Sequence, residues 1–355
     1  DGSFSNQTET QMRVIGGRLV LDPSTNWRST VAIGQSLDGA EDFKDRVFSS
    51  RYETLRNSLS WQNDVALGST GLLTAGVDYQ NDTVDSDTVF TVTSRDNTGV
   101  FIQYQKDVER YGVQWALRHD DNEQFGDYST GSVTLGVDTA KDQRATVFYG
   151  TAFKAPTFND LYYPNWGSPV LEPEESNTID LGYRVLLPDR RWTVNVFQTN
   201  IDELIAYDPI AAGPANIDEA QIRGVEAGLT MSRDAWRWSS ALTLLDTEQK
   251  SGANRGRELP RRPSEALSLN ISRDLGRYGT GMQVTFNGKT YDDLANTSLL
   301  DRYVVVDLVG HWKMTDNWWL NGKIKNVFDE DYETAAYYRQ PGIGCFVSVS
   351  YKKTE

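Results

Sequence analysis

The chain has 355 residues, a formal net charge of −15, one cysteine and two histidines. Cys345 alone cannot form an internal disulfide, and two imidazoles leave little material for a histidine-based catalytic or metal centre. The excess of acidic residues argues against a nucleic-acid partner, because neutralising phosphates requires an excess of lysine and arginine. With 10 Trp, 17 Tyr and 13 Phe, the chain is too aromatic to be disordered.

The mean hydropathy is −0.53, and no apolar run reaches the roughly 18 residues of a membrane-spanning helix. These two facts usually indicate a soluble protein, and the length alone would allow two domains. A transmembrane β-barrel is the exception, because its strands alternate lipid-facing and interior-facing residues and so keep the mean hydropathy low. The periodicity of the sequence can separate these two classes.

Alternation of apolar with polar or small residues recurs along the whole chain. In residues 178–187, for example, Ile179, Leu181 and Tyr183 alternate with Asp180 and Gly182. The same pattern holds in residues 113–119, 133–138, 191–198, 225–231 and 321–328. About 17 such stretches occur, without a linker or a convincing helical period, which predicts one all-β domain over residues 1–355.

Short and long connections alternate between these predicted strands. The short ones are rich in Asp, Asn, Gly and Pro, as tight turns require, and cover residues 21–26, 67–70, 106–111, 139–143, 187–190, 232–236, 273–279 and 313–317. The long ones cover residues 38–51, 81–96, 120–129, 154–176, 207–220, 246–261, 291–301 and 329–344. This segregation is typical of an antiparallel transmembrane β-barrel with short periplasmic turns and long extracellular loops.

Tryptophans gather beside the short turns, where amphipathic rings would form the aromatic girdle of such a barrel. The alternative is that they are ordinary strand aromatics. The residues concerned are Trp27, Trp192, Trp236, Trp238, Trp318 and Trp319.

Four segments resemble the barrel of TonB-dependent outer-membrane receptors: residues 118–126, 149–162, 164–183 and 325–333. The resemblance implies a receptor in the outer membrane of a Gram-negative bacterium that binds a small-molecule ligand and imports it with TonB. It implies no enzymatic activity and no covalent cofactor, and the sequence offers no catalytic motif.

Within these receptors the chain looks most similar to the cobalamin (corrinoid) branch, through residues 75–80, 95–103, 201–207, 222–227 and 259–262. The resemblance therefore implies cobalamin or a related corrinoid as the transported ligand. A ferric-siderophore or haem receptor is the main alternative. A passive porin-like barrel and a soluble multi-strand β protein are the alternatives from other classes.

A receptor of this family has a 22-stranded, plugged barrel, of which about 17 strands are expected here. The resemblance thus implies that this chain is the C-terminal part of a longer protein. The first strands, the plug through which TonB acts, the TonB box and the signal peptide would lie outside it. Tyr351 is followed by KKTE, whereas such chains usually end on an aromatic residue.

The resemblance also implies individual ligand contacts. Arg261 matches a corrinoid-contacting Arg of the family, although it could instead pair with a strand carboxylate. Ser50 matches a corrinoid-contacting Thr and keeps its hydroxyl group. A ligand-contacting Tyr would fall near residues 294–296, where this chain has no Tyr.

Two further groups of residues are candidates by their chemistry. Aromatic side chains that could stack on a large planar ligand, or simply pack the loops, are Tyr162, Tyr163, Trp166, Tyr337 and Tyr338. Carboxylates that could hold calcium in a loop are Asp38, Glu41, Asp42 and Asp45, although their spacing fits no known calcium loop and favours a solvated acidic loop.

Overall fold

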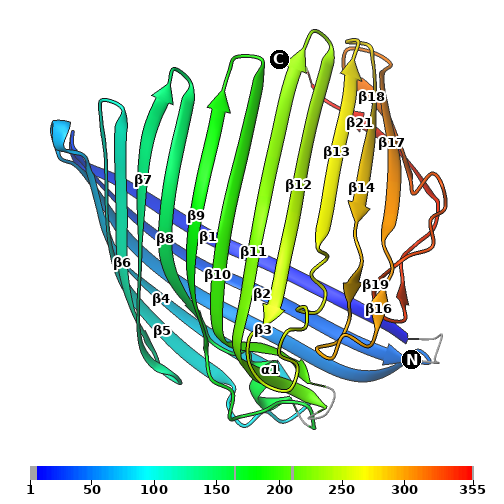
Figure 1. Cartoon of the computed structure of the whole chain (residues 1–355). Helices are drawn as coiled ribbons and strands as arrows, with labels where there is room; N and C mark the ends of the chain where they lie inside the picture. The colour runs from blue at the N-terminus through cyan, green and yellow to red at the C-terminus, as the bar shows by residue number, and fades with distance from the viewer. Residues whose placement is uncertain (1–5, 164, 209–211, 354–355) are drawn as a thin grey trace. The chain divides into compact units, whose positions relative to one another are not determined.

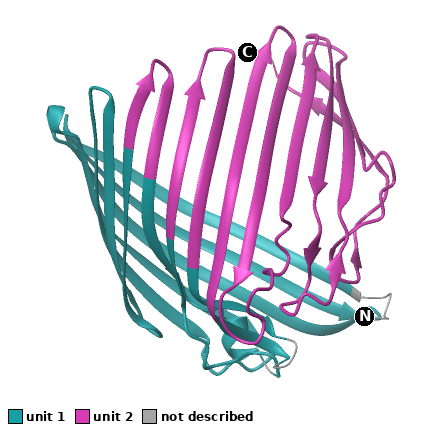
Figure 2. Ribbon diagram, viewed as in Figure 1, with its two compact units in different colours: residues 1–135, 148–177, 201–217 teal, residues 136–147, 178–200, 218–355 magenta. Residues whose placement is uncertain are grey.

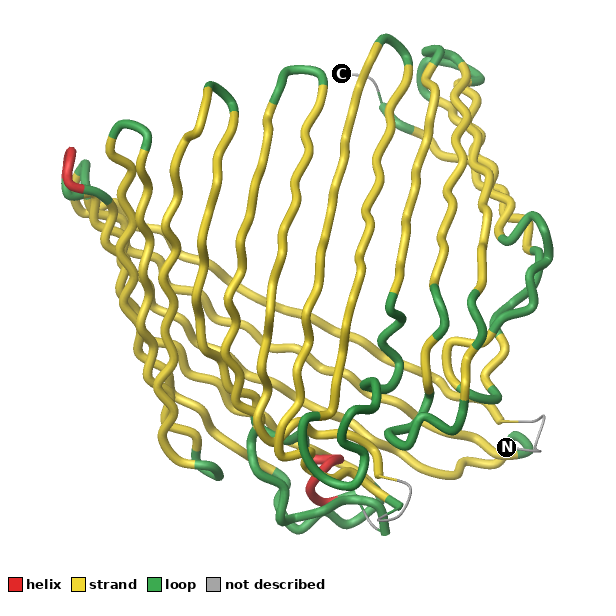
Figure 3. The backbone as a smooth tube through the Cα atoms, viewed as in Figure 1, coloured by secondary structure: helices red, strands yellow, loops and turns green. Residues whose placement is uncertain are grey.

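The computed structural model describes residues 6–163, 165–208 and 212–353, and most of them are in strands (Figure 3). In this described part, 17 strands belong to one antiparallel sheet, which confirms the predicted all-β class and strand number. The only helical elements there are the one-turn helix α1 (Phe158–Tyr162) and the 3-10 turn η1 (Gly68–Thr70). None of the described helices is long and apolar enough to cross a bilayer.

The chain divides into two compact units, coloured teal and magenta in Figure 2. Unit 1 comprises residues 1–135, 148–177 and 201–217, and unit 2 comprises residues 136–147, 178–200 and 218–355. Unit 1 contains the whole of β1 (Asn6–Ser24), β2 (Trp27–Lys44), β3 (Val47–Ala66), β4 (Leu72–Ser86), β5 (Ser94–Val108) and β6 (Tyr111–Asn122).

Five strands, all labelled in Figure 1, have residues in both of the units coloured in Figure 2: β7 (Gly126–Ala140), β8 (Gln143–Lys154), β9 (Glu174–Leu186), β10 (Arg190–Asp208) and β11 (Gly213–Arg233). Unit 2 then contains β12 (Trp236–Gln249), β13 (Glu265–Asp274), β14 (Tyr278–Asn287), β17 (Tyr303–Lys313), β18 (Trp318–Lys325) and β21 (Gly344–Tyr351). Its long connections carry two small hairpins, β15 (Thr290–Tyr291) with β16 (Leu299–Leu300) and β19 (Glu333–Ala335) with β20 (Tyr338–Arg339).

The strands of unit 1 have one polar and one apolar face, because successive side chains point to opposite sides of a strand. The register pairs Arg56 with Asp82 and Leu59 with Tyr79 across β3 and β4. Asp82 in turn lies opposite Arg95 on β5. Leu59 and Tyr79 are 45% and 37% exposed, so this apolar face is not covered by protein. An uncovered apolar face on alternating strands is the surface that a lipid-facing sheet requires.

Unit 2 has the same two-faced construction. On the polar face, Lys323 Nζ of β18 lies 2.8 Å from Asp307 Oδ2 of β17. On the other face, Leu308 pairs with Ile324, and these side chains are 40% and 38% exposed. The predicted alternation is therefore confirmed in both units.

The predicted short turns are all found between consecutive strands. Several contain a residue in the left-handed region of backbone space, as tight hairpins demand. Examples are Glu109 (φ 52°), Asp142 (φ 64°), Asp234 (φ 53°) and Gly276 (φ 77°).

The prediction of a long loop over residues 38–51 is wrong. Strands β2 and β3 continue to Lys44 and Val47, and only the turn residues Asp45 (φ 52°) and Arg46 (φ 66°) join them. The rings of Phe43 and Phe48 meet edge to face at 6.1 Å beside this turn. Composition suggested a loop because charged residues dominate the segment, but strand pairing satisfies its backbone while both faces stay polar.

Two other predicted long loops are also largely strand. The 120–129 segment contains only a short connection between β6 and β7, and most of the 207–220 segment belongs to β10 and β11. Residues 209–211 of the latter lie outside the described residues. The connections 87–93, 155–173, 250–264, 288–302 and 326–343 remain between the strands and carry the candidate site.

The tryptophans predicted to form a girdle do lie beside the short turns. Trp27, Trp236 and Trp318 each begin a strand directly after such a turn, and each is about two-fifths exposed or more. Trp318 also packs against Tyr351, with ring centroids 5.2 Å apart. Their position at a membrane boundary stays a prediction.

Candidate ligand-binding site

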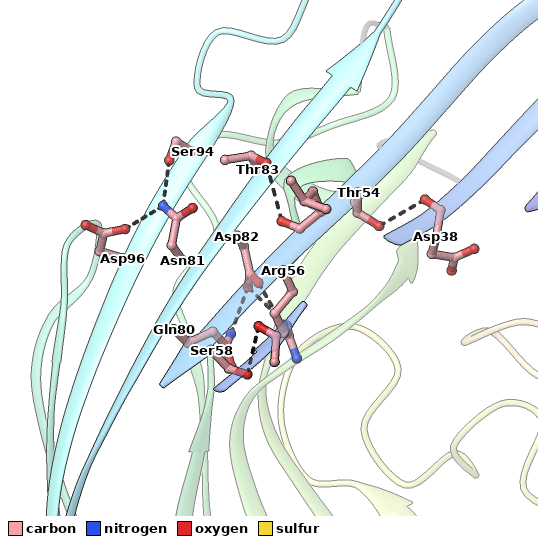
Figure 4. Close-up of polar contacts among 12 residues, drawn as sticks. Asp38, Thr54, Arg56, Ser58, Gln80, Asn81, Asp82, Thr83, Ser94 and Asp96 are labelled. Carbon is pink, nitrogen blue, oxygen red and sulfur yellow. Dashed lines mark hydrogen bonds and ion pairs between the residues drawn. The ribbon is translucent and has the colours of Figure 1, made fainter. Parts of the chain in front are cut away.

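The polar face of unit 1 carries a paired arginine and aspartate at the middle of β3. Arg56 donates from Nε and Nη2 to the two carboxylate oxygens of Asp82, at 2.7 and 3.0 Å. Gln80 donates from Nε2 to the same carboxylate at 2.8 Å (Figure 4). This bidentate geometry fixes the guanidinium plane against the polar face of the unit 1 strands, which we call the strand wall.

A second, more buried group lies on β4, β5 and β6. Arg118 donates to both oxygens of Asp120 at 2.7 and 2.8 Å and to Asp78 at 2.8 Å. Asp120 is only 4% exposed and also accepts from Asn97 Nδ2 at 2.9 Å. Two carboxylates and one guanidinium are thus held in one satisfied network on the wall.

Arg95 differs from these two arginines, because it forms no ion pair with any residue the structure describes. Its Nη1 donates to the carbonyl oxygen of Pro156 at 2.9 Å. Its guanidinium lies 5.1 Å from the centre of the Phe158 ring and 5.8 Å from that of Phe125. Arg95 therefore joins the strand wall to the connection that contains α1.

Two pockets of about 380 and 370 Å³ meet at these residues and share Arg56, Asp82 and Arg95 in their walls. Asn159 of α1 lines the second pocket, and its Oδ1 is buried without a hydrogen-bond partner among the described residues. A buried acceptor without a donor is costly unless something else bonds to it. The pocket thus offers a free acceptor beside a cation that has no paired carboxylate.

Helix α1 is held by its own sequence. Thr157 forms a capping box with Asp160: the Thr157 hydroxyl accepts from the Asp160 backbone, and the Asp160 carboxylate accepts from the Thr157 backbone. Phe158 and Leu161 are buried beneath it, so the helix packs on the strands instead of extending into solvent.

The three aromatic candidates of this connection have different surroundings. Tyr162 is half-buried, accepts a hydrogen bond from Gln124 Nε2 and packs against the cluster around Phe158. Tyr163 is 43% exposed and meets Trp166 edge to face at 6.5 Å. The structure thus keeps Tyr163 accessible, while Tyr162 packs the loop against its neighbours.

Ser50 lies on β3 directly opposite Asp42 of β2 and donates to its carboxylate at 3.1 Å. Asp38 and Asp42 occupy alternate positions on one face of β2, whereas Glu41 points to the other face. No group of three potential metal ligands forms among the described residues. The acidic residues therefore do not converge in a loop, because strand alternation separates them, and calcium binding by Asp38, Glu41, Asp42 and Asp45 stays an untested prediction.

In unit 2, the connections 250–264 and 288–302 interlock. Gln249 is 1% exposed and donates from Nε2 to the carbonyl oxygens of Leu294 (2.8 Å) and Glu258 (3.1 Å). The side chain of Asn296 pairs with both backbone groups of Glu258, at 2.8 and 3.0 Å. Leu259 and Leu294 are buried at 0% and 4% exposure. The two loops therefore share a small core of their own.

Asp293 stabilises a turn within the 288–302 connection. The carboxylate of Asp293 accepts from the backbone of Thr297 and Ser298 and from the Thr297 hydroxyl, at 2.7–3.2 Å. Burial raises the pKa of Asp293, but these hydrogen bonds outweigh it and leave the pKa below its usual value. The loop is thus stabilised by the charged form of Asp293.

Arg261 stands in the turn before β13 rather than at the strand start, with φ 55°. It donates from Nε to Asp292 Oδ1 at 2.6 Å, and this hydrogen bond raises the pKa of the guanidinium. The Arg261 side chain is nevertheless 60% exposed, which leaves its other donors open. Tyr338 lies near enough to interact electrostatically with Arg261 and is 69% exposed, and Tyr337 is 90% exposed.

The segment 294–296, where the family's ligand-contacting tyrosine is missing, lies in the loop pair of unit 2. Leu294 is buried and its carbonyl oxygen accepts from Gln249, so this residue packs the loop pair, whereas Ala295 and Asn296 are only partly buried. Of the sequence candidates, Tyr163 and Trp166 meet in unit 1, whereas the side chain of Arg261 in unit 2 contacts Asp292, which was not a candidate. Sequence reasoning did not single out Arg95 and Asn159. Arg95 lies within a segment that resembles the family, but only the fold shows that it lacks a carboxylate partner.

Comparison with known proteins identifies the family. Residues 2–327 match the family model described as TonB dependent receptor-like, beta-barrel. The chain therefore belongs to the family of TonB-dependent receptor β-barrels, which are transporters and receptors of the Gram-negative outer membrane.

Among characterised relatives, the chain is similar to the vitamin B12 transporter BtuB of Photobacterium profundum, with 30% identity over 91% of this chain. It is 29% identical to BtuB of Vibrio vulnificus over 98% of this chain. The two alignments cover 54% and 58% of those proteins, so this chain spans little more than half of their length.

Solved structures show the same fold at lower sequence identity. The siderophore receptor PiuA from Acinetobacter baumannii superposes with a TM-score of 0.79 and 17% identity, over 98% of this chain and 64% of that one. The copper transporter OprC also gives a TM-score of 0.79, with 15% identity, over 96% and 67% of the two chains.

Proposed function

We propose that this chain is the ligand-binding barrel part of an outer-membrane receptor that imports cobalamin or a related corrinoid with energy supplied through TonB. The observation that carries the proposal is the similarity to two vitamin B12 transporters at 29–30% identity over more than nine-tenths of the chain. Similarity to siderophore and copper transporters extends over the same strands but falls to 15–17% identity.

The chemistry of the candidate site supports this ligand class. Corrinoids present amide groups and a phosphate around a large ring. Arg95 in unit 1 and Arg261 in unit 2 both keep donors that no carboxylate saturates, and such donors suit amides and phosphates. Asn159 Oδ1 supplies an acceptor for an amide, and Tyr163 and Tyr338 offer exposed rings for apolar contact.

Binding to the complete protein in outer-membrane vesicles tests the ligand. Cyanocobalamin should bind saturably and more tightly than ferric-catecholate siderophores or haem. Saturable binding of a siderophore or haem, with none of cyanocobalamin, would reassign the ligand while keeping the receptor class.

A second experiment tests energy coupling. Cells that produce the complete protein should accumulate cyanocobalamin only when TonB is present. Equal accumulation without TonB, together with steady single-channel conductance of the purified protein, would indicate a passive porin-like barrel.

The siderophore alternative keeps one specific observation in its favour. The cobalamin branch has a ligand-contacting tyrosine near residues 294–296, where this chain has no Tyr and where Leu294 is buried. A corrinoid would therefore need other contacts in unit 2, for which Arg261 and Tyr338 are the exposed candidates.

A further inference from the structure

A groove of about 500 Å³ lies on the apolar face of unit 2, between β9 and β12. Its apolar walls come from Ile179, Leu181, Val196, Val225 and Leu244. Four of these side chains are 40–53% exposed, and no described residue covers them. Val225 and Leu244 share this face because they lie opposite each other in the register. The next pair along the strands, Glu226 and Thr243, points to the other side.

One end of this groove is polar. Arg223 on β11 donates from Nε to Gln198 Oε1 at 3.2 Å and lies 4.0 Å from Asp246 Oδ2. The Arg223 side chain is 51% exposed, and Glu248 on β12 also interacts with it electrostatically. This end of β12 leads into the 250–264 connection, so Arg223 stands where the apolar face gives way to the long loops.

A second polar row lies beyond the first. Gln221 donates to Asn200 at 2.8 Å, and Lys250 pairs with Glu248. Both polar rows cross β10, β11 and β12 at one end of the groove, and the rest of the groove is apolar. A lipid is divided in the same way, into a polar head and an apolar chain.

The groove and Arg223 together lead us to infer a binding site for one phosphorylated lipid of the outer leaflet. Its phosphate would contact Arg223, and one acyl chain would lie along Val196 and Leu244. An arginine presents several donors to a phosphate in a planar arrangement, and at 4.0 Å Asp246 is a weak competitor for it. Near the membrane interface an arginine costs little, so Arg223 is tolerated there even before a lipid binds.

This site is separate from the candidate ligand-binding residues, since none of Arg95, Asn159 and Arg261 lines the groove. The lipid would bind whether the imported ligand is a corrinoid or a siderophore. Failure of the lipid inference would therefore leave the proposed function intact.

Native mass spectrometry of the complete protein in an uncharged detergent provides the test, with diphosphorylated lipid A and its dephosphorylated form as probes. The diphosphorylated form should bind about tenfold more tightly, a factor typical of one charge-assisted contact. Arg223→Gln should abolish this preference, Arg223→Lys should retain most of it, and Asp246→Asn should strengthen it.

Matched variants separate the site from general membrane contact. Arg28→Gln removes a similarly exposed, ion-paired arginine that lies away from the groove and should change nothing. Val196→Trp should fill the groove and weaken binding, whereas Leu229→Trp on the same face outside the groove should not. Equal affinity for the two lipid forms, or equal losses in Arg223→Gln and Arg28→Gln, would overturn the inference.

Discussion

The two units hold their candidate ligand-binding residues by different physical means. In unit 1 the order lies in the strand wall, where Arg118 and Asp120 form a buried charged network and the α1 connection is joined to the wall through Arg95. In unit 2 the order lies in the loops, where Gln249 and Asn296 bind two connections to each other. The candidate residues are therefore held mainly by the strands in unit 1 and mainly by the connections in unit 2.

The largest expected effect is on the wall of unit 1. Arg118→Met would leave Asp120 nearly buried without its counter-charge, which should lower the free energy of unfolding by about 2–3 kcal/mol. Guanidinium unfolding in detergent, followed by tryptophan fluorescence, measures this. Arg28→Met is the control, because the Arg28–Asp22 pair is more than half exposed and screened by solvent, so its loss should have a much smaller effect. Equal effects in the two variants would contradict the idea of a wall-based framework.

The next effect concerns the loops of unit 2. Gln249→Leu would remove the donor to the buried carbonyl of Leu294 and should lower the opening free energy of the loop pair by about 2 kcal/mol. Amide hydrogen exchange in residues 250–264 and 288–302 should then accelerate, while the strands of unit 1 remain protected. Gln340→Leu, which removes an amide with two hydrogen bonds from a more open site, should have a smaller effect. Unchanged exchange in Gln249→Leu would show that the loops are held in another way.

The third effect, on ligand affinity, shows which unit contributes more to ligand binding. Arg95→Gln and Arg261→Gln should each weaken cyanocobalamin binding to the complete protein about tenfold, because each removes one charge-assisted contact. If the two arginines act independently, the double variant should lose about a hundredfold. A loss confined to one variant would assign the ligand to that unit, and no loss in either would contradict both assignments.

The smallest effect is a dependence on pH. The pKa of Asp293 is depressed in the folded loop, so its stabilisation is fully present above the ordinary value of 3.8 and is lost as the pH falls through the lower folded pKa. Asp293→Asn should reduce the protection of residues 288–302 at neutral pH by about 1 kcal/mol and remove the dependence below pH 3.8. Exchange rates measured across this range would test both, and an unaltered acid profile in the variant would exclude Asp293 as its source.

The sequence predicted the class of fold well because the signal is local. Alternation such as that of Ile179 and Leu181 depends only on the two-residue period of a strand, and turns such as Asp142 and Asp234 depend only on backbone preference. It predicted the acidic segment 38–51 poorly, because a charged hairpin and a charged loop have the same composition. Only pairing with β1 and β3 distinguishes them.

The candidate site depends more on tertiary contacts. Sequence similarity and chemistry pointed to Arg261 and to the aromatic residues of the loops, whose roles stay predictions; of these, Tyr163, Tyr337 and Tyr338 are exposed, whereas Tyr162 is half-buried. Neither sequence similarity nor residue chemistry could show that Gln249 bonds to the carbonyl oxygen of Leu294. These residues are 45 positions apart and meet only because the two loops pack together.

By itself, the sequence determined that this protein is a two-faced sheet of about 17 strands, since strand periodicity and turn chemistry act over a few residues. The tertiary structure alone decided which arginines are neutralised. Arg56, Arg118 and Arg95 look alike in the sequence. Asp82 lies opposite both Arg56 and Arg95 in the register, but its carboxylate bonds to Arg56. Arg118 bonds to Asp120 of its own strand and to Asp78, whereas Arg95 donates to a backbone carbonyl. The distribution of free charge depends on neighbours that are distant in the chain, and that distribution is what a ligand encounters.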